Sequence, residues 1–254
     1  MKKLFIVASL LWPIQSHPME SQLLDNSVEF YDDLLNEEYS TEVEARIANK
    51  KNIDALIKDT HYSPLLWACR FDHRFHFTQQ LLELNANPNH QVLGDTPLLI
   101  AASYLSQKNV EELLKQNNIN INPQFRYTSN VTPLHAACLS SVTVKEEAIK
   151  QEAIVKALLD HGANPNLRNR SEHTPLYEMI CLRFRDHCDI PAKLEAFVAQ
   201  RKKIIALIAP KTDLALKYKS GKTLFEDAYA INDPLCVEFA EFAKQAAEPK
   251  NKIS

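Results

Sequence analysis

The sequence has very little glycine, with three residues in 254. A phosphate-binding loop of the P-loop type needs two glycines five positions apart, so that backbone amides can surround the phosphate. The segment Ser220-Gly221-Lys222-Thr223 resembles the end of such a loop, but Leu216 stands where the first glycine is required. We therefore reject nucleotide binding here, and we expect no cofactor.

The sequence also lacks an excess of one charge. Its 29 Lys and Arg residues face 32 Asp and Glu residues, which gives a net charge of −3. Nucleic acids and anionic membranes attract proteins through a summed positive field. We therefore expect neither as a partner.

Long hydrophobic runs are absent except for a short one at the N-terminus. Lys2 and Lys3 precede the apolar residues 4–12, and Pro13 ends the run. A basic start, a short apolar core and a polar continuation are typical of a secretory signal peptide, and this core is too short to cross a bilayer as a helix. We predict a signal peptide at residues 1–16 and an exported protein, periplasmic or secreted. The alternative is an N-terminal helix packed on the rest of the chain, in a cytoplasmic protein.

Five cysteines leave at least one thiol free. Cys69 and Cys138 occupy the same position in two segments of a repeated pattern that are not neighbours, which places them too far apart to bond. We expect both to be small buried residues. Cys181 and Cys188 could pair if the loop between them folds back.

Short segments with one pattern recur along the chain. Each begins with Ser or Thr, and Pro-Leu follows in all but the last. Proline fits the first turn of a helix, and the hydroxyl before it can cap the free amides of that turn. The five copies start at Ser63, Thr96, Thr132, Thr174 and Thr223, at spacings of 33, 36, 42 and 49 residues.

These copies resemble the ankyrin repeat, whose signature Thr-Pro-Leu-His-x-Ala returns about every 33 residues. Residues 132–137 match it in full, and the resemblance covers roughly residues 40–245. It implies an all-α solenoid in which helix-turn-helix units stack side by side and β-hairpin loops project from one edge. It also implies that His135 is structural, with hydrogen bonds around the turn that joins hairpin and helix.

The resemblance divides the chain into three parts after residue 16. Residues 17–40 form an acidic lead-in without repeats, residues 41–248 the ankyrin repeat domain, and residues 249–254 a tail. The open end of a stack needs a capping unit, which we place at residues 41–60 as two short helices, at residues 41–48 and 52–58. The repeats start near residues 61, 94, 130, 172 and 221.

Two repeats carry extra length between their paired helices, at residues 141–149 and 183–203. Apolar residues at helical spacing indicate that the second insertion extends its helix backwards. Insertions in repeat proteins often mark a functional face. A small enzyme or an enzyme inhibitor, with a pocket built by these insertions, is therefore the alternative function.

Candidate chemistry along the chain is weak. Cys181, His187, Cys188 and Asp189 match no zinc-binding spacing, and no serine or cysteine lies in a recognisable nucleophile motif. Adjacent acidic pairs such as Glu146-Glu147 point in different directions on a helix. We therefore expect neither catalysis nor a metal site.

A surface for another protein is the remaining interpretation. Ankyrin-type stacks bind partners with their hairpin tips and inner helix face, and Gly94, Asn130, Glu172 and Gly221 mark the turns of four hairpins. The later hairpins are basic, which favours an acidic partner segment. We expect a monomer that binds one partner protein, with no membrane contact after signal removal. The candidate contact residues are Gln91, Leu93, Asp95, Phe125, Arg126, Tyr127, Arg168, Arg170, His173, Lys217, Tyr218, Lys219 and Lys222.

Overall fold

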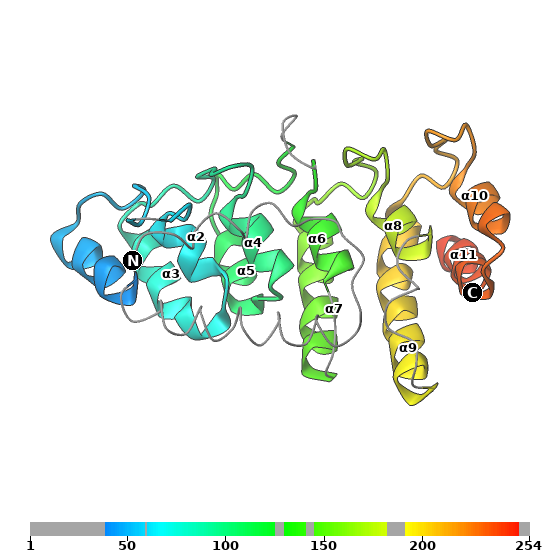
Figure 1. Cartoon of the computed structure of the whole chain (residues 1–254), viewed down its shortest axis with the longest axis horizontal. Helices are drawn as coiled ribbons and strands as arrows, with labels where there is room; N and C mark the ends of the chain where they lie inside the picture. Colours follow the sequence, from blue (N-terminus) through cyan, green and yellow to red (C-terminus); the bar gives the residue numbers. More distant parts are fainter. Residues whose placement is uncertain (1–38, 59, 125–129, 141–144, 182–190, 249–254) are drawn as a thin grey trace, which may run out of the picture.

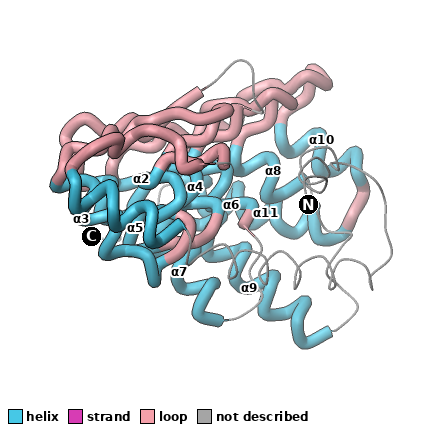
Figure 2. Tube along the Cα trace, turned by 60° about the vertical axis from the view of Figure 1, so that its left-hand side comes forward, coloured by secondary structure: helices cyan, strands magenta, loops and turns pink. Residues whose placement is uncertain are grey.

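The computed structural model describes residues 39–58, 60–124, 130–140, 145–181 and 191–248. Two rows of helices stand side by side along an elongated stack, with the loops gathered along one edge (Figures 1 and 2). The first row consists of α2 (Pro64–Cys69), α4 (Pro97–Ser103), α6 (Pro133–Leu139), α8 (Pro175–Cys181) and α10 (Leu224–Ile231). The second row consists of α3 (Phe75–Glu83), α5 (Gln107–Leu114), α7 (Lys145–Asp160), α9 (Pro191–Ile208) and α11 (Pro234–Ala247), preceded by helical residues 39–49. Short 3₁₀ helices, η1 (Asp72–Arg74) and η2 (Ala209–Lys211), adjoin α3 and α9.

Each helix packs on its neighbours in the same row and on its partner in the other row. One apolar core runs between the rows from Val43 to Ala243. Among the described residues there are no strands, only the isolated bridges Val92↔Asp95 and Lys217↔Thr223 in the loops. The predicted all-α stack is confirmed.

Five hydroxyl side chains start the first-row helices. Each accepts a hydrogen bond from the backbone amide three residues ahead, at 3.2–3.4 Å. Proline follows the cap in four helices, and Leu224 follows it in α10. Each of the five segments picked out from the sequence therefore begins a first-row helix. The caps are Ser63, Thr96, Thr132, Thr174 and Thr223.

Polar side chains from the second row, or from the turn before it, bind the C-terminal carbonyls of first-row helices. Arg74 donates to the carbonyl oxygen of Trp67 at 3.0 Å. Gln151 donates to that of Ala137 at 2.9 Å. Since buried carbonyls need partners, these bonds hold the two rows together.

An asparagine ladder links the loops that follow the second-row helices. In each rung, a side-chain oxygen accepts the backbone amide of the next unit at 2.7–2.9 Å, and within a unit a second such bond continues the chain. The ladder thus crosses the repeats from one end of the stack to the other. Its rungs are Asp54 to Asn87, Asn89 to Asn120, Asn122 to Asn164, and Asn166 to Asp213.

The predicted second helix of the capping unit, residues 52–58, is wrong. Helical residues 39–49 end at Lys50, whose φ is positive, as is that of Asn52. The following residues form turns, because the Arg46 guanidinium takes the carbonyl oxygens of Asn52 (3.0 Å) and Leu56 (2.8 Å). Helical residues 39–49 therefore correspond to a second-row helix. Of the predicted lead-in, residues 17–38 lie outside the described residues, and Tyr39 and Ser40 belong to the helix.

The insertions lengthen two second-row helices. α7 has 16 residues and α9 has 18, compared with 9 in α3 and 8 in α5. Figure 1 shows both extending away from the hairpin edge. The predicted backward extension of the helix is confirmed from Pro191 onward, whereas residues 141–144 and 182–190 lie outside the described residues.

Candidate protein-binding surface

The first hairpin is a tight turn over residues 92–95. The amide of each end residue donates to the carbonyl oxygen of the other, at 3.0 and 2.9 Å. Leu93 and Gly94 both have positive φ, at 53° and 99°. Gln91 is exposed, Asp95 is half-buried, and Leu93 is 74% exposed at the tip. Burial raises the pKa of Asp95.

The second hairpin contains Phe125, Arg126 and Tyr127, which lie outside the described residues. The residues at its base are described. Gln124 and Asn130 both donate side-chain hydrogen bonds to the carbonyl oxygen of Arg168, at 3.3 and 3.2 Å. The second hairpin is thus tied to the third.

Arg168 ties the third hairpin to the fourth. Its Nη2 donates to the carbonyl oxygen of Lys217 at 2.8 Å, and its Nη1 lies 3.5 Å from the carboxylate of Glu172. The guanidinium also lies 5.5 Å from the ring centroid of Tyr218. These Arg168 contacts therefore hold the third and fourth hairpins together as one surface.

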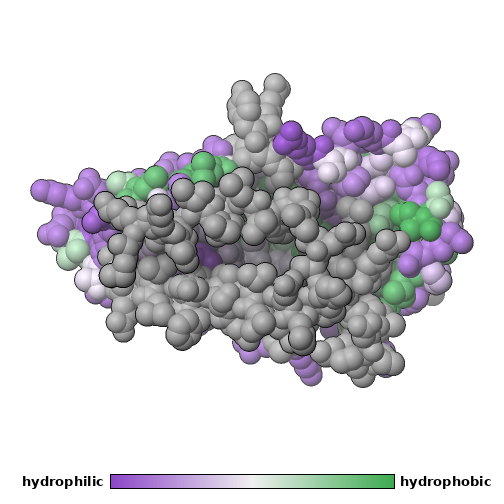
Figure 3. Space-filling model, in the orientation of Figure 1, coloured by the Kyte–Doolittle hydropathy of each residue, from purple (hydrophilic) through white to green (hydrophobic). Residues whose placement is uncertain are grey.

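The tips of these two hairpins are basic. Arg170, Lys217, Lys219 and Lys222 are all exposed. Figure 3 shows hydrophilic side chains gathered over the hairpins at the C-terminal end of the stack. We call these four residues the basic tips.

Tyr218 and His173 support the surface from within. Tyr218 is only 6% exposed, and its hydroxyl pairs with that of Thr174 at 2.9 Å, so its predicted place among exposed contact residues does not fit its burial. Its pKa is raised by burial. His173 is half-buried, with its ring stacked on Tyr177 at 4.3 Å between centroids. Burial lowers the pKa of His173.

A polar network that the sequence did not predict lies under the basic tips. The hydroxyl of Tyr177 donates to Asp227 at 3.2 Å, and Ser220 donates to the same carboxylate oxygen at 2.8 Å. Tyr177 occupies the position of the signature histidine in its repeat. This replacement is the feature of the sequence that could have indicated the network. The Ser220 contact and the positive φ of Gly221 (78°) explain the Ser-Gly-Lys-Thr segment as a hairpin exit.

A second missed feature is an aromatic cluster around Arg70. Its guanidinium lies 5.4, 5.3 and 4.7 Å from the ring centroids of Tyr62, Phe71 and Tyr104. Tyr104 also accepts a hydrogen bond from Arg70 at 3.0 Å and is 43% exposed. Arginine and tyrosine are enriched at interface hot spots, so this cluster adds to the candidate surface.

The described cysteines do not form a reactive site. Cys69, Cys138, Cys181 and Cys236 are buried free thiols, as predicted for the first two. Burial raises the pKa of Cys69 and of Cys181 to about 12, which disfavours the nucleophilic thiolate. Cys188, the proposed partner of Cys181, lies outside the described residues. The described residues contain no cluster of side chains suited to a metal ion.

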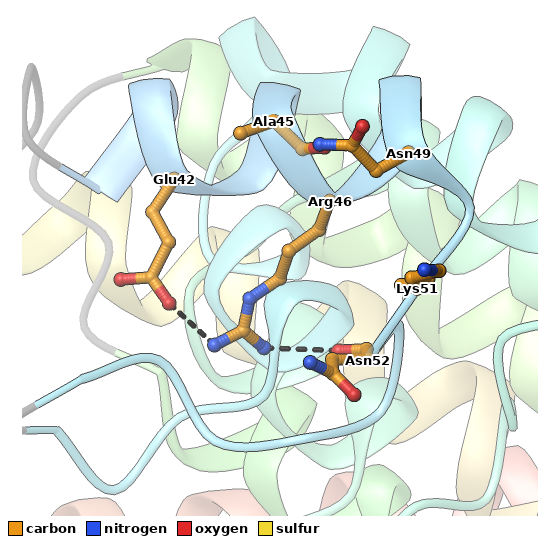
Figure 4. Close-up of a pocket in the computed structure, with 6 residues that line it drawn as sticks. All are labelled: Glu42, Ala45, Arg46, Asn49, Lys51 and Asn52. Atoms are coloured by element: carbon orange, nitrogen blue, oxygen red, sulfur yellow. Dashed lines mark hydrogen bonds and ion pairs between the residues drawn. The ribbon is translucent and has the colours of Figure 1, made fainter.

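Two of the hollows among the described residues lie near the two ends of the stack. One borders helical residues 39–49, where Figure 4 shows the Arg46 guanidinium directed at Glu42 and at the carbonyl of Asn52. The other, of about 680 Å³, lies between α9 and α11 beside Phe242. Neither is lined by the described residues of the insertions, 145–149 and 191–203. In the part of the chain that the structure describes, none of the helices has the length and apolar composition needed to cross a membrane.

Comparison with known proteins agrees with this arrangement. A family model of three ankyrin repeats matches residues 34–125 and 65–169, which together are more than half of the chain. The chain belongs to the ankyrin repeat family. Ankyrin repeats are protein-binding modules, and the helix pairs α8–α9 and α10–α11 continue the stack beyond the matched residues.

Three similar proteins illustrate the relationship. YahD, an ankyrin repeat protein of Escherichia coli K12, is 42% identical over 69 residues, which are 26% of this chain and 30% of YahD. Alpha-latrocrustotoxin-Lt1a of Latrodectus tredecimguttatus is 32% identical over 108 residues, which are 42% of this chain and 8% of the toxin. The chain thus matches less than a third of the length of either protein. The crystal structure of the ankyrin repeat protein EF0377 superposes with a TM-score of 0.61 at 20% identity, over 85% of this chain and 95% of that one, and supports the fold alone.

Proposed function

We propose that this protein binds a partner protein along its hairpin edge, and that an acidic segment of the partner lies on the basic tips. The observation that carries the proposal is the Arg168 bridge to the carbonyl oxygen of Lys217. The bridge makes one surface of two hairpins that are 49 residues apart in sequence. Arg170, Lys217, Lys219 and Lys222 extend from it into solvent. Opposite charges on such a surface would fix the orientation of the partner and speed its association.

Charge reversal tests this proposal. Partner proteins are first identified by affinity capture and mass spectrometry, and the captured protein is then purified. The test variant carries Lys217→Glu, Lys219→Glu and Lys222→Glu in the full chain. The control variant carries Lys108→Glu, Lys156→Glu and Lys244→Glu, which are exposed second-row positions with the same total charge change.

We expect the hairpin variant to lose the partner and the control to retain it. Binding by the wild type should also weaken as salt is added, because exposed charges are screened. Equal binding by both variants would refute a role for the basic tips. Size-exclusion chromatography with light scattering should show that the free protein is a monomer.

The N-terminal pattern supports a second part of the proposal. We propose that residues 1–16 direct export, and that the protein acts as a secreted effector on a protein of a host cell. N-terminal sequencing of the protein recovered from each cell fraction tests this. An exported product that begins near residue 17 is the expected result, whereas a cytoplasmic product that begins at Met1 or Lys2 would overturn it.

A further inference from the structure

Leu93 has an apolar side chain, a high exposure to solvent and a positive φ. Together these three features are unfavourable for a residue with only a structural role. It lies at the tip of the first hairpin with φ at 53°. It is 74% exposed, the largest exposure among the exposed large apolar residues of the described structure. L-residues other than Asn and Asp avoid this left-handed region because the β-carbon approaches the following carbonyl oxygen. An apolar side chain that stays exposed to water also lacks the stabilisation that burial would give.

The other described residues with positive φ show how such positions are normally stabilised. Asn52, Asn85, Asn130 and Asn232 carry the side chain that best tolerates this conformation. Lys50 and Glu172 are exposed at positive φ as well, but their charged side chains are well solvated in water. Leu105 has a φ of 50° but is only 6% exposed, so burial of its side chain offsets the backbone strain. Leu93 has neither advantage.

The turn itself does not require leucine. The bonds between Val92 and Asp95 use backbone atoms only, and Gly94 supplies the second positive φ, of 99°. A two-residue turn of this kind favours Asn-Gly. Asparagine at position 93 would therefore suit the hairpin better than leucine.

We propose that Leu93 is a specificity-determining anchor, which inserts into an apolar pocket on the partner protein. Backbone strain in a folded protein concentrates at ligand contacts, and an exposed apolar side chain held on a rigid turn loses little freedom when it is buried by a partner. The partner would thus present an apolar pocket to the first hairpin and an acidic segment to the basic tips. This inference rests on the proposed function, because Leu93 shares the hairpin edge with those tips.

Stability measurements test the premise without a partner. The full chain is compared with Leu93→Asn and Leu93→Ala, where alanine removes the apolar side chain without favouring a positive φ. We expect Leu93→Asn to raise the midpoint of thermal unfolding by about 3 °C. A midpoint no higher than that of Leu93→Ala would overturn the inference.

Crosslinking and binding test the anchor itself. A photoreactive amino acid is placed at position 93, 170, 219 or 149 of the full chain, the last being an exposed position on α7 away from the hairpins. The same partner should crosslink from 93, 170 and 219. The purified partner should then bind Leu93→Asn roughly 10-fold more weakly than the wild type, and it should bind Ile149→Asn as the wild type.

The Leu93 anchor and the proposed function can be refuted separately. Crosslinks from 170 and 219 but none from 93, or unchanged affinity in Leu93→Asn, would overturn the anchor and leave the proposed function standing. Crosslinks from the hairpins no more frequent than those from 149 would overturn both.

Discussion

His135 shows at the scale of one residue how the signature histidine acts in this stack. Its Nδ1 lies 2.8 Å from the hydroxyl of Thr132 and accepts the Thr132 amide at 3.3 Å, which completes the capping box of α6. Its Nε2 lies 3.0 Å from the carbonyl oxygen of His173 in the next repeat. A neutral ring satisfies both contacts, with the proton on Nε2. The structural role implied by the family resemblance agrees with these contacts.

Burial lowers the pKa of His135 from 6.5 to about 4. Between these values the unfolded chain binds a proton that the folded protein does not, so acidification from pH 6.5 to 4 favours unfolding. The loss amounts to about 3 kcal/mol at most. We predict that His135→Gln is less stable than the wild type at pH 7, and that this difference shrinks towards pH 4. Urea unfolding of both proteins across this range measures it, and a constant difference would contradict the prediction.

Arg46 also joins separate parts of the backbone by hydrogen bonds, in this case within the N-terminal unit. Its guanidinium binds three backbone carbonyls of residues 52–56 together with the carboxylate of Glu42. We predict that Arg46→Ala destabilises this unit by about 2 kcal/mol, since hydrogen bonds to charged groups are worth about 1.5–3 kcal/mol. Lys51→Ala, at an exposed position in the same turn, should have little effect. Hydrogen exchange of the amides of residues 43–58 would report the difference, and equal exchange in the two variants would refute it.

At the scale of elements, the sequence predicted helix starts well and loop structure poorly. The Ser/Thr-Pro-Leu segments encode their own capping chemistry, so the starts of α2, α4, α6 and α8 could be located directly. Residues 52–58 were mistaken for a helix because Ile53, Leu56 and Ile57 have helical spacing. Their structure is decided by the Arg46 side chain, which lies six to ten positions earlier. The spacing of apolar residues does not reveal such a contact.

The candidate binding surface was predictable to a similar extent. The hairpin positions of Gln91, Leu93, Arg170 and the three lysines could be located from the turn residues, and all are exposed. The burial of Tyr218 could not be predicted, because it depends on Thr174 from another repeat. The positive φ of Leu93 could not be predicted either, since the sequence indicates a positive φ at Gly94 alone.

The asparagine ladder allows a prediction at this scale. The Asn122 side chain accepts the Asn164 amide at 2.8 Å and donates to the carbonyl oxygen of Gly162 at 3.1 Å. Asn122→Ala removes both bonds between repeats and should reduce the free energy of unfolding by about 1–3 kcal/mol. Asn117→Ala, at an exposed position in the same loop, is the matched control. Denaturant titration of the two variants gives the comparison, and equal midpoints would show that the ladder contributes nothing.

At the scale of the whole molecule, the main contacts between the described helices join helices of the same unit or of neighbouring units. Stability in such a stack is approximately a sum over units and their interfaces, and units in the middle have two interfaces where terminal units have one. We predict that the amides of α4 to α7 exchange most slowly and those of α10 and α11 faster. Native-state hydrogen exchange tests this, and uniform protection along the chain would indicate all-or-none unfolding instead.

The position of the asparagine ladder also affects which changes in helix length the stack can accommodate. The rungs lie in the loops after the second-row helices, and the extra residues of α7 and α9 project from the opposite side. Spacing between units is therefore fixed at one edge, while differences in unit length are absorbed at the other. Shortening or replacing the first turns of α7 and α9 should therefore leave the arrangement of the hairpin row unchanged.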